Sequence, residues 1–300
     1  MAIASDSFTG VDLSRLPSPD AVETLDFETI FAEAVAQFQG LFPGFDATVE
    51  SDPVVKLIQL FCYREMVLRQ RVNDAARAVM VAYAKGADLD ALAALFRVER
   101  FIITPADPDT ATPAVLETDD DLRRRMVLAP EGYSVAGPEG AYIYHALSAS
   151  ADVLDASATS PSPGVVVVSV LSRSGDGTAP QATLDAVTAK LTDQGIRPLT
   201  DFVTVQSAAV VAFNVVATLY FFSGPDRSVV MAAAQARLDD YLANARRLGR
   251  DITRAGIIAA LSPEGVQNVI LQSPAEDVVL TRQQAQHCTS TTVYDAGVAE

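Results

Sequence analysis

The sequence predicts an α+β protein: a long-helix N-terminal bundle region followed by two small α/β modules. One hypothesis is that the two modules arose by duplication. Apolar residues recur at helical spacing through the first hundred positions, and a proline-rich stretch follows between Pro105 and Pro113. From Gly140 onward, helical patterns alternate with apolar runs typical of strands. With 300 residues, 49% hydrophobic and 20% charged, the chain is long enough to bury a substantial core.

These patterns divide the chain into five expected regions. They are an N-terminal helical (core-bundle) region at 1–100, a Pro-rich linker and connecting helix at 101–139, a first α/β module at 140–222, a second at 223–282, and a polar C-terminal tail at 283–300.

The first predicted helix spans 26–42, where apolar residues recur every three or four positions before Pro43 and Gly44. Asp52 and Pro53 are good starting residues for a second helix, and no other Pro or Gly occurs before Gly86. The second helix should therefore run for about 33 residues, or roughly 50 Å. A third, capped by Asp88, should end near Phe96.

The long helix carries a narrow seam with the three-and-four spacing of a coiled coil. Its members are Ile58, Phe61, Glu65, Leu68, Val72, Ala75, Val79 and Ala82. The short neighbouring helix offers too little partner surface, so we expect part of this seam to contact another chain. The same spacing also fits a long helix packed on its own domain.

After the linker, three aspartates at 119–121 precede three arginines at 123–125. Acidic residues suit the first turn of a helix, and each aspartate has an arginine four positions later, so we interpret the segment as a helix start. A catalytic or metal-binding cluster is disfavoured because adjacent carboxylates on a helix point in different directions and no histidine accompanies them.

The second half should contain alternating helices and strands. Two segments resemble each other, "YHALSASADVLDAS" from Tyr144 and "IAALSPEGVQNVILQS" from Ile258, which favours duplication without proving it. The expected helices are 141–148, 181–192, 227–246 and 253–261, and the expected strands are 153–158, 165–171, 202–206, 210–222, 267–271 and 278–280.

Charge limits the partners. The chain has 22 Lys and Arg residues and 38 Asp and Glu residues, a formal net charge of -16, which would repel DNA or an anionic membrane; we expect no nucleic-acid partner and no membrane partner. The N-terminal segment has no secretory pattern, and the longest apolar run, 208–222, is too short to span ~30 Å of hydrocarbon as a helix. Cys62 and Cys288 form no disulfide framework, and a reducing compartment is the simplest expectation.

The sequence offers no recognisable catalytic or cofactor motif, so we expect no cofactor, no metal and no enzymatic activity. His287 and Cys288 cannot supply a full metal ligand set alone. The loop "SGDGTAP" has the glycines of a phosphate loop, but Asp176 lies within it and no lysine lies nearby. His145 and Asp152 could form a base with its orienting acid, although no motif surrounds a nucleophile.

Several stretches together resemble the J-type baseplate assembly proteins, baseplate wedge components of contractile-tailed phages and R-type bacteriocins (tailocins). They are "DPVVKLIQLFCYREMVLRQRVNDAARAVMVAYAKGADLDALAALF", "EGYSVAGPEGAYIYHAL", "TSPSPGVVVVSVLSRSGDGTAP", and "RLGRDITRAGIIAAL" with "EGVQNV" and "DVVL". The likeness runs in order from about Asp12 to Cys288, which makes it specific.

The resemblance implies a structural wedge protein in the baseplate of a virion or bacteriocin particle, assembled in the host cytoplasm. Its N-terminal helices would bundle with a second copy of itself and a second wedge protein, and the sheath-initiator protein would dock on the bundle. Its C-terminal modules would meet those of neighbouring wedges in a six-fold ring around the hub. Contacts between the C-terminal modules, together with the linker from Pro105 to Pro113, would let the wedges reorient, and this conformational change would trigger sheath contraction.

This reading assigns roles to particular residues. The expected helix-bundle contacts are Ile58, Phe61, Leu68, Val72 and Val79, with Glu65 and Arg69 setting the register. Expected ring contacts are Arg247, Arg250 and Asp251. Two alternatives remain: an unrelated soluble homo-oligomeric scaffold, and a metal-independent hydrolase that uses His145.

Overall fold

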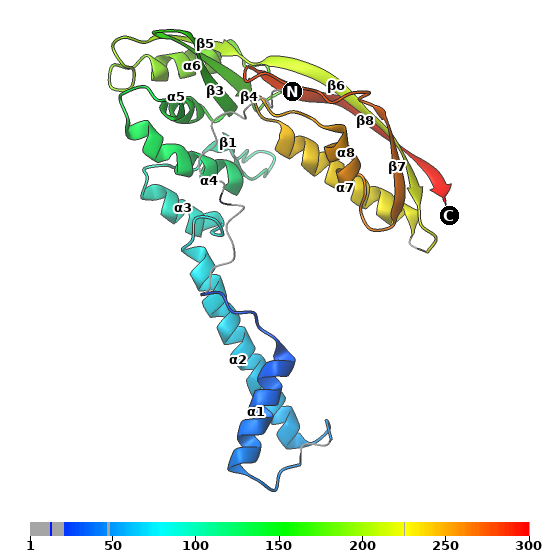
Figure 1. Ribbon diagram of the computed structural model, residues 1–300. Coiled ribbons are helices and arrows are strands. Elements are labelled where there is room, and N and C mark those ends of the chain that lie inside the picture. The colour runs from blue at the N-terminus through cyan, green and yellow to red at the C-terminus, as the bar shows by residue number, and fades with distance from the viewer. Residues whose placement is uncertain (1–12, 14–20, 47–48, 225, 300) are drawn as a thin grey trace. The chain divides into compact units, whose positions relative to one another are not determined.

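The computed structural model describes residue 13 and residues 21–46, 49–224 and 226–299. The contacts divide the chain into two compact units, one covering Val11–Glu99 and the other containing Arg100–Glu300 (Figure 1). The first is helical, and the second combines helices with small sheets. The expected α+β class, with helices at the N-terminus, is therefore confirmed.

The N-terminal unit contains α1 (Phe27–Leu41), α2 (Pro53–Ala78) and α3 (Gly86–Ala94). Side-chain caps define the starts of the first two, because the carboxylates of Asp26 and Asp52 accept hydrogen bonds from the first-turn backbone. α1 packs along one side of α2, where Ile30 and Cys62 are buried. Asn73 of α2 exchanges two 2.9 Å hydrogen bonds with the backbone of Glu23, ahead of α1.

The long helix is shorter than predicted. It has 26 residues and ends at Ala78, followed by turns over 79–83. β-branched and aromatic residues at Val79, Val81 and Tyr83 have low helix propensity, which accounts for the earlier end. Gly86, expected to close this helix, begins α3 with φ +52°. Val79 therefore lies just beyond the helix.

The proline-rich segment is a hairpin, which corrects the expectation of a linker without structure. Strands β1 (Ile102–Thr104) and β2 (Val115–Leu116) pair antiparallel, and Asp107 pairs with Thr112 near the tip. At the base, Glu117 N–H donates to the Phe101 carbonyl at 2.9 Å, and Phe101 N–H donates to the Glu117 carboxylate at 3.1 Å. The chain thus enters and leaves the hairpin at nearly the same place, between Phe101 and Glu117.

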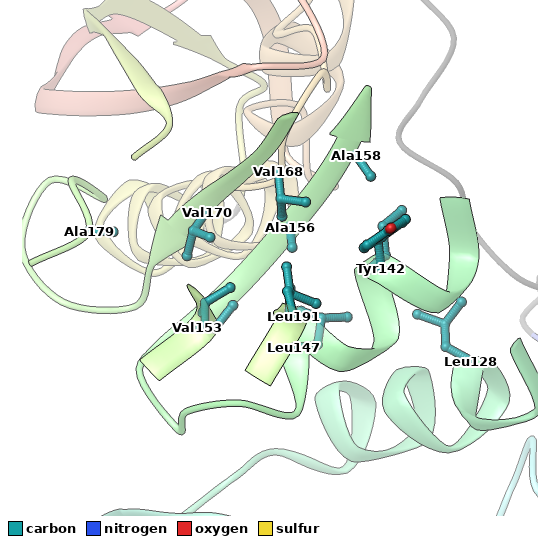
Figure 2. Packing of buried hydrophobic residues seen from close by; sticks show 13 residues of the cluster. Leu128, Tyr142, Leu147, Val153, Ala156, Ala158, Val168, Val170, Ala179 and Leu191 are labelled. Carbon is teal, nitrogen blue, oxygen red and sulfur yellow. The ribbon is translucent and has the colours of Figure 1, made fainter. Parts of the chain in front are cut away.

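α4 (Asp119–Leu128) and a 3-10 turn (Ala129–Tyr133) precede the first module, which begins with α5 (Glu139–Leu147). Its sheet has the order β3-β4-β5, formed by β3 (Val153–Ser162), β4 (Val165–Ser172) and β5 (Phe202–Ser207), with α6 (Gln181–Leu191) between the last two. β3 and β4 are antiparallel, whereas β4 and β5 are parallel. Helix residues such as Tyr142 and Leu147 pack against Ala156 and Val168 of the sheet (Figure 2).

The second module contains β6 (Ala209–Phe221), α7 (Arg227–Ala245), α8 (Arg254–Ala260), β7 (Val266–Ser273) and β8 (Gln284–Val298). β6 is the central strand, antiparallel to β7 and parallel to β8, and α7 and α8 lie along one face of the sheet (Figure 1).

Two expectations in this half need correction. The stretch at 283–300, expected as a polar tail, contains the 15-residue strand β8, and the strand assigned to the end of the first module is the centre of the second sheet. β8 is ordered by pairing with β6 and by packing of Cys288 and Val293 on the second core. The expected strand at 278–280 is reduced to a bridge between Ile252 and Val278.

The two echoing segments fall on equivalent helix-to-strand units, α5–β3 and α8–β7. Both sheets also have a middle strand with one antiparallel and one parallel neighbour. The chain order differs, because in the second module the middle strand comes first and the helix-to-strand unit follows it. Duplication therefore remains a hypothesis.

Candidate interaction surface and charged cluster

α2 presents a face, opposite α1, that nothing in the described N-terminal unit covers. We call it the outward face; it consists of Leu57, Leu60, Phe61, Arg64, Val67, Leu68, Arg71 and Val72. Phe61, Leu68 and Val72 are 62%, 64% and 65% exposed. Single exposed apolar residues are normal on a soluble surface, but a continuous row of them indicates an interaction site.

Helical geometry explains why these residues remain exposed. Val55, Cys62 and Asn73 are buried, and they share the side of α2 that meets α1. At 100° per residue, Leu57, Phe61 and Leu68 project to the opposite side. One short helix can cover only one side of α2, so the other side keeps its large apolar groups in solvent.

The predicted bundle contacts divide between these two sides. Phe61, Leu68 and Val72 lie on the outward face, whereas Ile58 is half-buried toward α1. Val79 is 69% exposed but lies beyond the end of the helix. The structure adds Leu57 and the residues at 60, 64, 67 and 71, which a helical-wheel projection of the sequence could have identified.

Glu65 and Arg69, the predicted register residues, form an ion pair at 2.7 Å along the helix. Arg69 also approaches the Glu23 carboxylate at 3.8 Å. Both ion pairs are solvent-exposed and contribute little to stability. Any role for them would be to set the register in which a partner helix aligns with α2.

A second feature is a buried charged cluster where α4 meets both modules. Asp121 accepts hydrogen bonds from Arg173 of the first module at 2.6 Å and from Arg247 of the second at 2.8 Å. Arg247 also donates to the Leu154 carbonyl at 2.8 Å. Burial would raise the pKa of Asp121, but Arg247 and Arg173 together hold that pKa below its ordinary value.

Neighbouring groups extend this cluster. Asp155, fully buried, accepts from Arg124 at 2.7 Å and from the Leu248 backbone N–H at 2.8 Å. Glu117 binds Arg125 through both carboxylate oxygens, at 2.8 and 2.6 Å. The cluster therefore joins the hairpin base, α4 and both modules through paired charges.

This cluster changes how the aspartate and arginine runs of α4 are interpreted. The segment is a helix start, as predicted, and the structure shows that the Thr118 side chain caps it. Asp120 pairs with Arg123, three positions further on, and Asp121 pairs with the distant Arg173 and Arg247.

The predicted ring residues lie near this region. Arg247 is engaged within the chain, and the Asp251 carboxylate accepts from the Leu280 backbone N–H at 2.7 Å. Arg250 donates to the Asn244 carbonyl at 3.0 Å from an exposed position. Intrachain contacts thus explain Arg247 and Asp251 without a neighbouring subunit.

The candidate catalytic groups are not paired with each other. His145 contacts the Gly132 carbonyl at 3.2 Å, and burial lowers its pKa. Asp152 instead accepts hydrogen bonds from the hydroxyls of Ser172, Ser174 and Thr183. These two residues therefore do not form the pair of a base and its orienting acid that the hydrolase hypothesis requires.

His287 and Cys288 line a groove of about 400 Å³ between α7 and β8, and burial raises the pKa of the Cys288 thiol. Within the ranges that the structure describes, no three His, Cys, Asp or Glu side chains are grouped to hold a metal ion. None of the described helices combines the length and the apolarity needed to cross a membrane.

Three consecutive domain descriptions match the chain. The baseplate J-like N-terminal domain matches residues 50–107, the baseplate J-like central domain 134–207, and the baseplate J-like C-terminal domain 213–294. The N-terminal match contains all of α2, the central match contains the sheet β3-β4-β5, and the C-terminal match covers most of the sheet β7-β6-β8.

Two individual proteins are similar to the chain to different degrees. Baseplate protein J of Escherichia phage P2 is 48% identical over 299 residues, which cover 97% of this chain and 99% of that protein. A chain in the cryo-EM structure of the anti-feeding prophage baseplate, six-fold symmetrised, matches with a TM-score of 0.34 and 17% identity over 51% of this chain and 36% of its own length.

Proposed function

We propose, from the premise that this chain belongs to the baseplate J-like protein family, that it joins wedge subunits within a contractile-tail baseplate. The family match and the 48% identity to a phage baseplate protein support a structural protein of the phage baseplate. The finer role, in a phage or in a phage-derived bacteriocin, is our inference.

The observation that carries the proposal is the outward face of α2. Burial of a side chain such as Phe61 or Leu68 contributes about 1.5–3 kcal/mol of stabilising free energy per residue. In the single chain these side chains stay exposed over several consecutive turns, so this stabilisation is absent. A helix bundle with other chains would recover it. The expected participants are a second copy of this chain and a second wedge protein, with the sheath-initiator protein docked on the bundle.

The C-terminal unit would supply the contacts between neighbouring wedges in the ring. Exposed Arg250 remains a candidate there, whereas Arg247 and Asp251 would act indirectly by shaping the second module. The paired charges that join α4 to both modules suit a part that transmits movement when sheath contraction is triggered. Assembly would take place in the host cytoplasm.

The test is a double substitution on the outward face, Phe61→Asp with Leu68→Asp, in a phage that carries an affinity tag on another wedge protein. We expect the tagged complex to lose this chain, because two carboxylates would be buried in an apolar contact. Leu199→Asp is the matched control, since Leu199 is 96% exposed in the other unit. Unchanged co-purification of the double variant would overturn the proposal.

A further inference from the structure

We propose that the outward face of α2 receives an acidic amphipathic helix from a chain of different sequence, with carboxylates about two turns apart that meet Arg64 and Arg71. The inference rests on the proposed function, because it takes α2 to be a bundle helix. It adds the chemistry of the partner, which neither the apolar seam nor the family match specifies.

The first support is the charge of α2. The helix contains five Lys and Arg residues and two Asp and Glu residues, a net charge of +3, in a chain whose net charge is -16. The exposed apolar row is thus set in the basic part of an acidic protein. A basic interface favours an acidic partner both during encounter and in the final complex.

The second support is the pairing of these basic residues. Arg69 pairs with Glu65 and Arg77 approaches Asp74 at 3.9 Å, so both have carboxylates on their own helix. Among the residues that the structure describes, neither Arg64 nor Arg71 has an ion-pair partner. Lys56, near the start of α2, donates a hydrogen bond to the Gln59 side chain at 3.1 Å. On the outward face, Arg64 and Arg71 are therefore the basic groups left for a partner to neutralise.

The third support is their position. Arg64 and Arg71 are seven residues apart, so they lie on one stripe, two turns from each other. Leu57, Phe61 and Leu68 lie along one side of this stripe, and Leu60 and Val67 lie along the other. A helix that covers the apolar rows would also desolvate both guanidinium groups, which is costly unless carboxylates bind them.

A second copy of this chain does not supply that chemistry on this face. Two α2 helices packed by their outward faces would bring arginines toward arginines. The exposed acidic residues of α1 are Glu28 and Glu33, five positions apart, so they project about 140° from each other around the helix. A different chain is therefore the better occupant, and the second copy would use another part of the bundle.

The test uses intact particles in which Arg64→Lys and Arg71→Lys keep the charge and provide primary amines. A zero-length carbodiimide reagent joins such amines only to carboxylates in direct contact, and mass spectrometry then identifies the linked peptides. We expect links from both positions to acidic residues of another tail protein, about seven residues apart. Links to carboxylates of this same sequence, or no link from either position, would overturn the inference.

Arg77→Lys is the matched control for the reagent, since it should link to Asp74 of its own helix. Charge reversal provides a second readout: Arg64→Glu with Arg71→Glu should reduce particle yield at least tenfold, and Arg77→Glu should leave it near wild type. If the double reversal is harmless while the Phe61 and Leu68 substitutions abolish co-purification, the inference fails and the proposed function stands. If both pairs of substitutions are harmless, both fail.

Discussion

Asp121 shows how one side chain can hold separate parts of the protein together. It lies on α4 but binds arginines 52 and 126 positions further along the chain, one in each module. Removing its charge would leave two guanidinium groups without their anionic partner. Losing one partner of such a largely buried cluster costs about 3 kcal/mol.

We therefore predict that Asp121→Asn lowers the free energy of unfolding by about 3 kcal/mol, measured by urea denaturation. Asp120→Asn is the matched control one residue away, because Asp120 is 86% exposed and its pair with Arg123 should contribute less than about 1 kcal/mol. Equal effects of the two substitutions would show that the cluster does not stabilise the unit.

The same cluster predicts acid sensitivity. The pKa of Asp121 in the folded protein lies below its ordinary value of 3.8, so near that pH the unfolded chain binds more protons. Stability from this residue is present above pH 3.8 and declines as the pH falls through the folded pKa. Urea midpoints at a series of pH values should fall less steeply with acid for Asp121→Asn than for wild type.

The local sequence could not reveal these partners. The aspartate and arginine runs correctly predicted a helix start, because capping and helix-dipole effects act within one turn. The same reasoning assigned Asp121 to an arginine four positions on, although Arg173 and Arg247 reach it only after both modules have folded. Arg247 was predicted to lie at a ring interface because its hydrogen bonds within the chain cannot be recognised from the sequence.

At the level of elements, the proline-rich hairpin changes the expected mechanics. Its ends, Phe101 and Glu117, are hydrogen-bonded to each other, so the length of the intervening segment does not alter the path of the chain. A segment closed in this way cannot act as a spacer. The pivot of any wedge movement should therefore lie outside residues 102–116.

Replacing residues 105–114 with Asn-Gly should leave folding, assembly and contraction intact. These two residues form a tight turn that can join Thr104 to Val115 directly. Particle yield and the fraction of contracted sheaths, counted by electron microscopy after a trigger, provide the measurement. Particles that assemble normally but fail to contract would return the segment to the mechanism.

Periodicity predicted some elements better than others. α1 and the strands of the first module follow strong apolar patterns and lie close to their expected positions. β8 was missed because its segment, which contains three Thr and two Gln, lacks an apolar run and is ordered by pairing with β6. The end of α2 was missed because no Pro or Gly marks it.

For the molecule as a whole, the outward face of α2 connects structure with assembly. Spacing alone predicted the seam and three of its exposed residues, Phe61, Leu68 and Val72. It could not show which side α1 covers, because that depends on how a separate, earlier helix packs against α2. Once α1 is in place, the uncovered side identifies the surface available to other subunits.

Thiol accessibility of a Leu68→Cys variant tests most directly whether this surface is covered in the assembled baseplate. Leu68 is 64% exposed in the single chain, so the new thiol should react rapidly with a maleimide in the isolated protein. In intact particles we expect at least a tenfold slower reaction, with full reactivity restored when urea dissociates them. Equal rates in the isolated chain and in the particle would contradict a role for α2 in joining subunits.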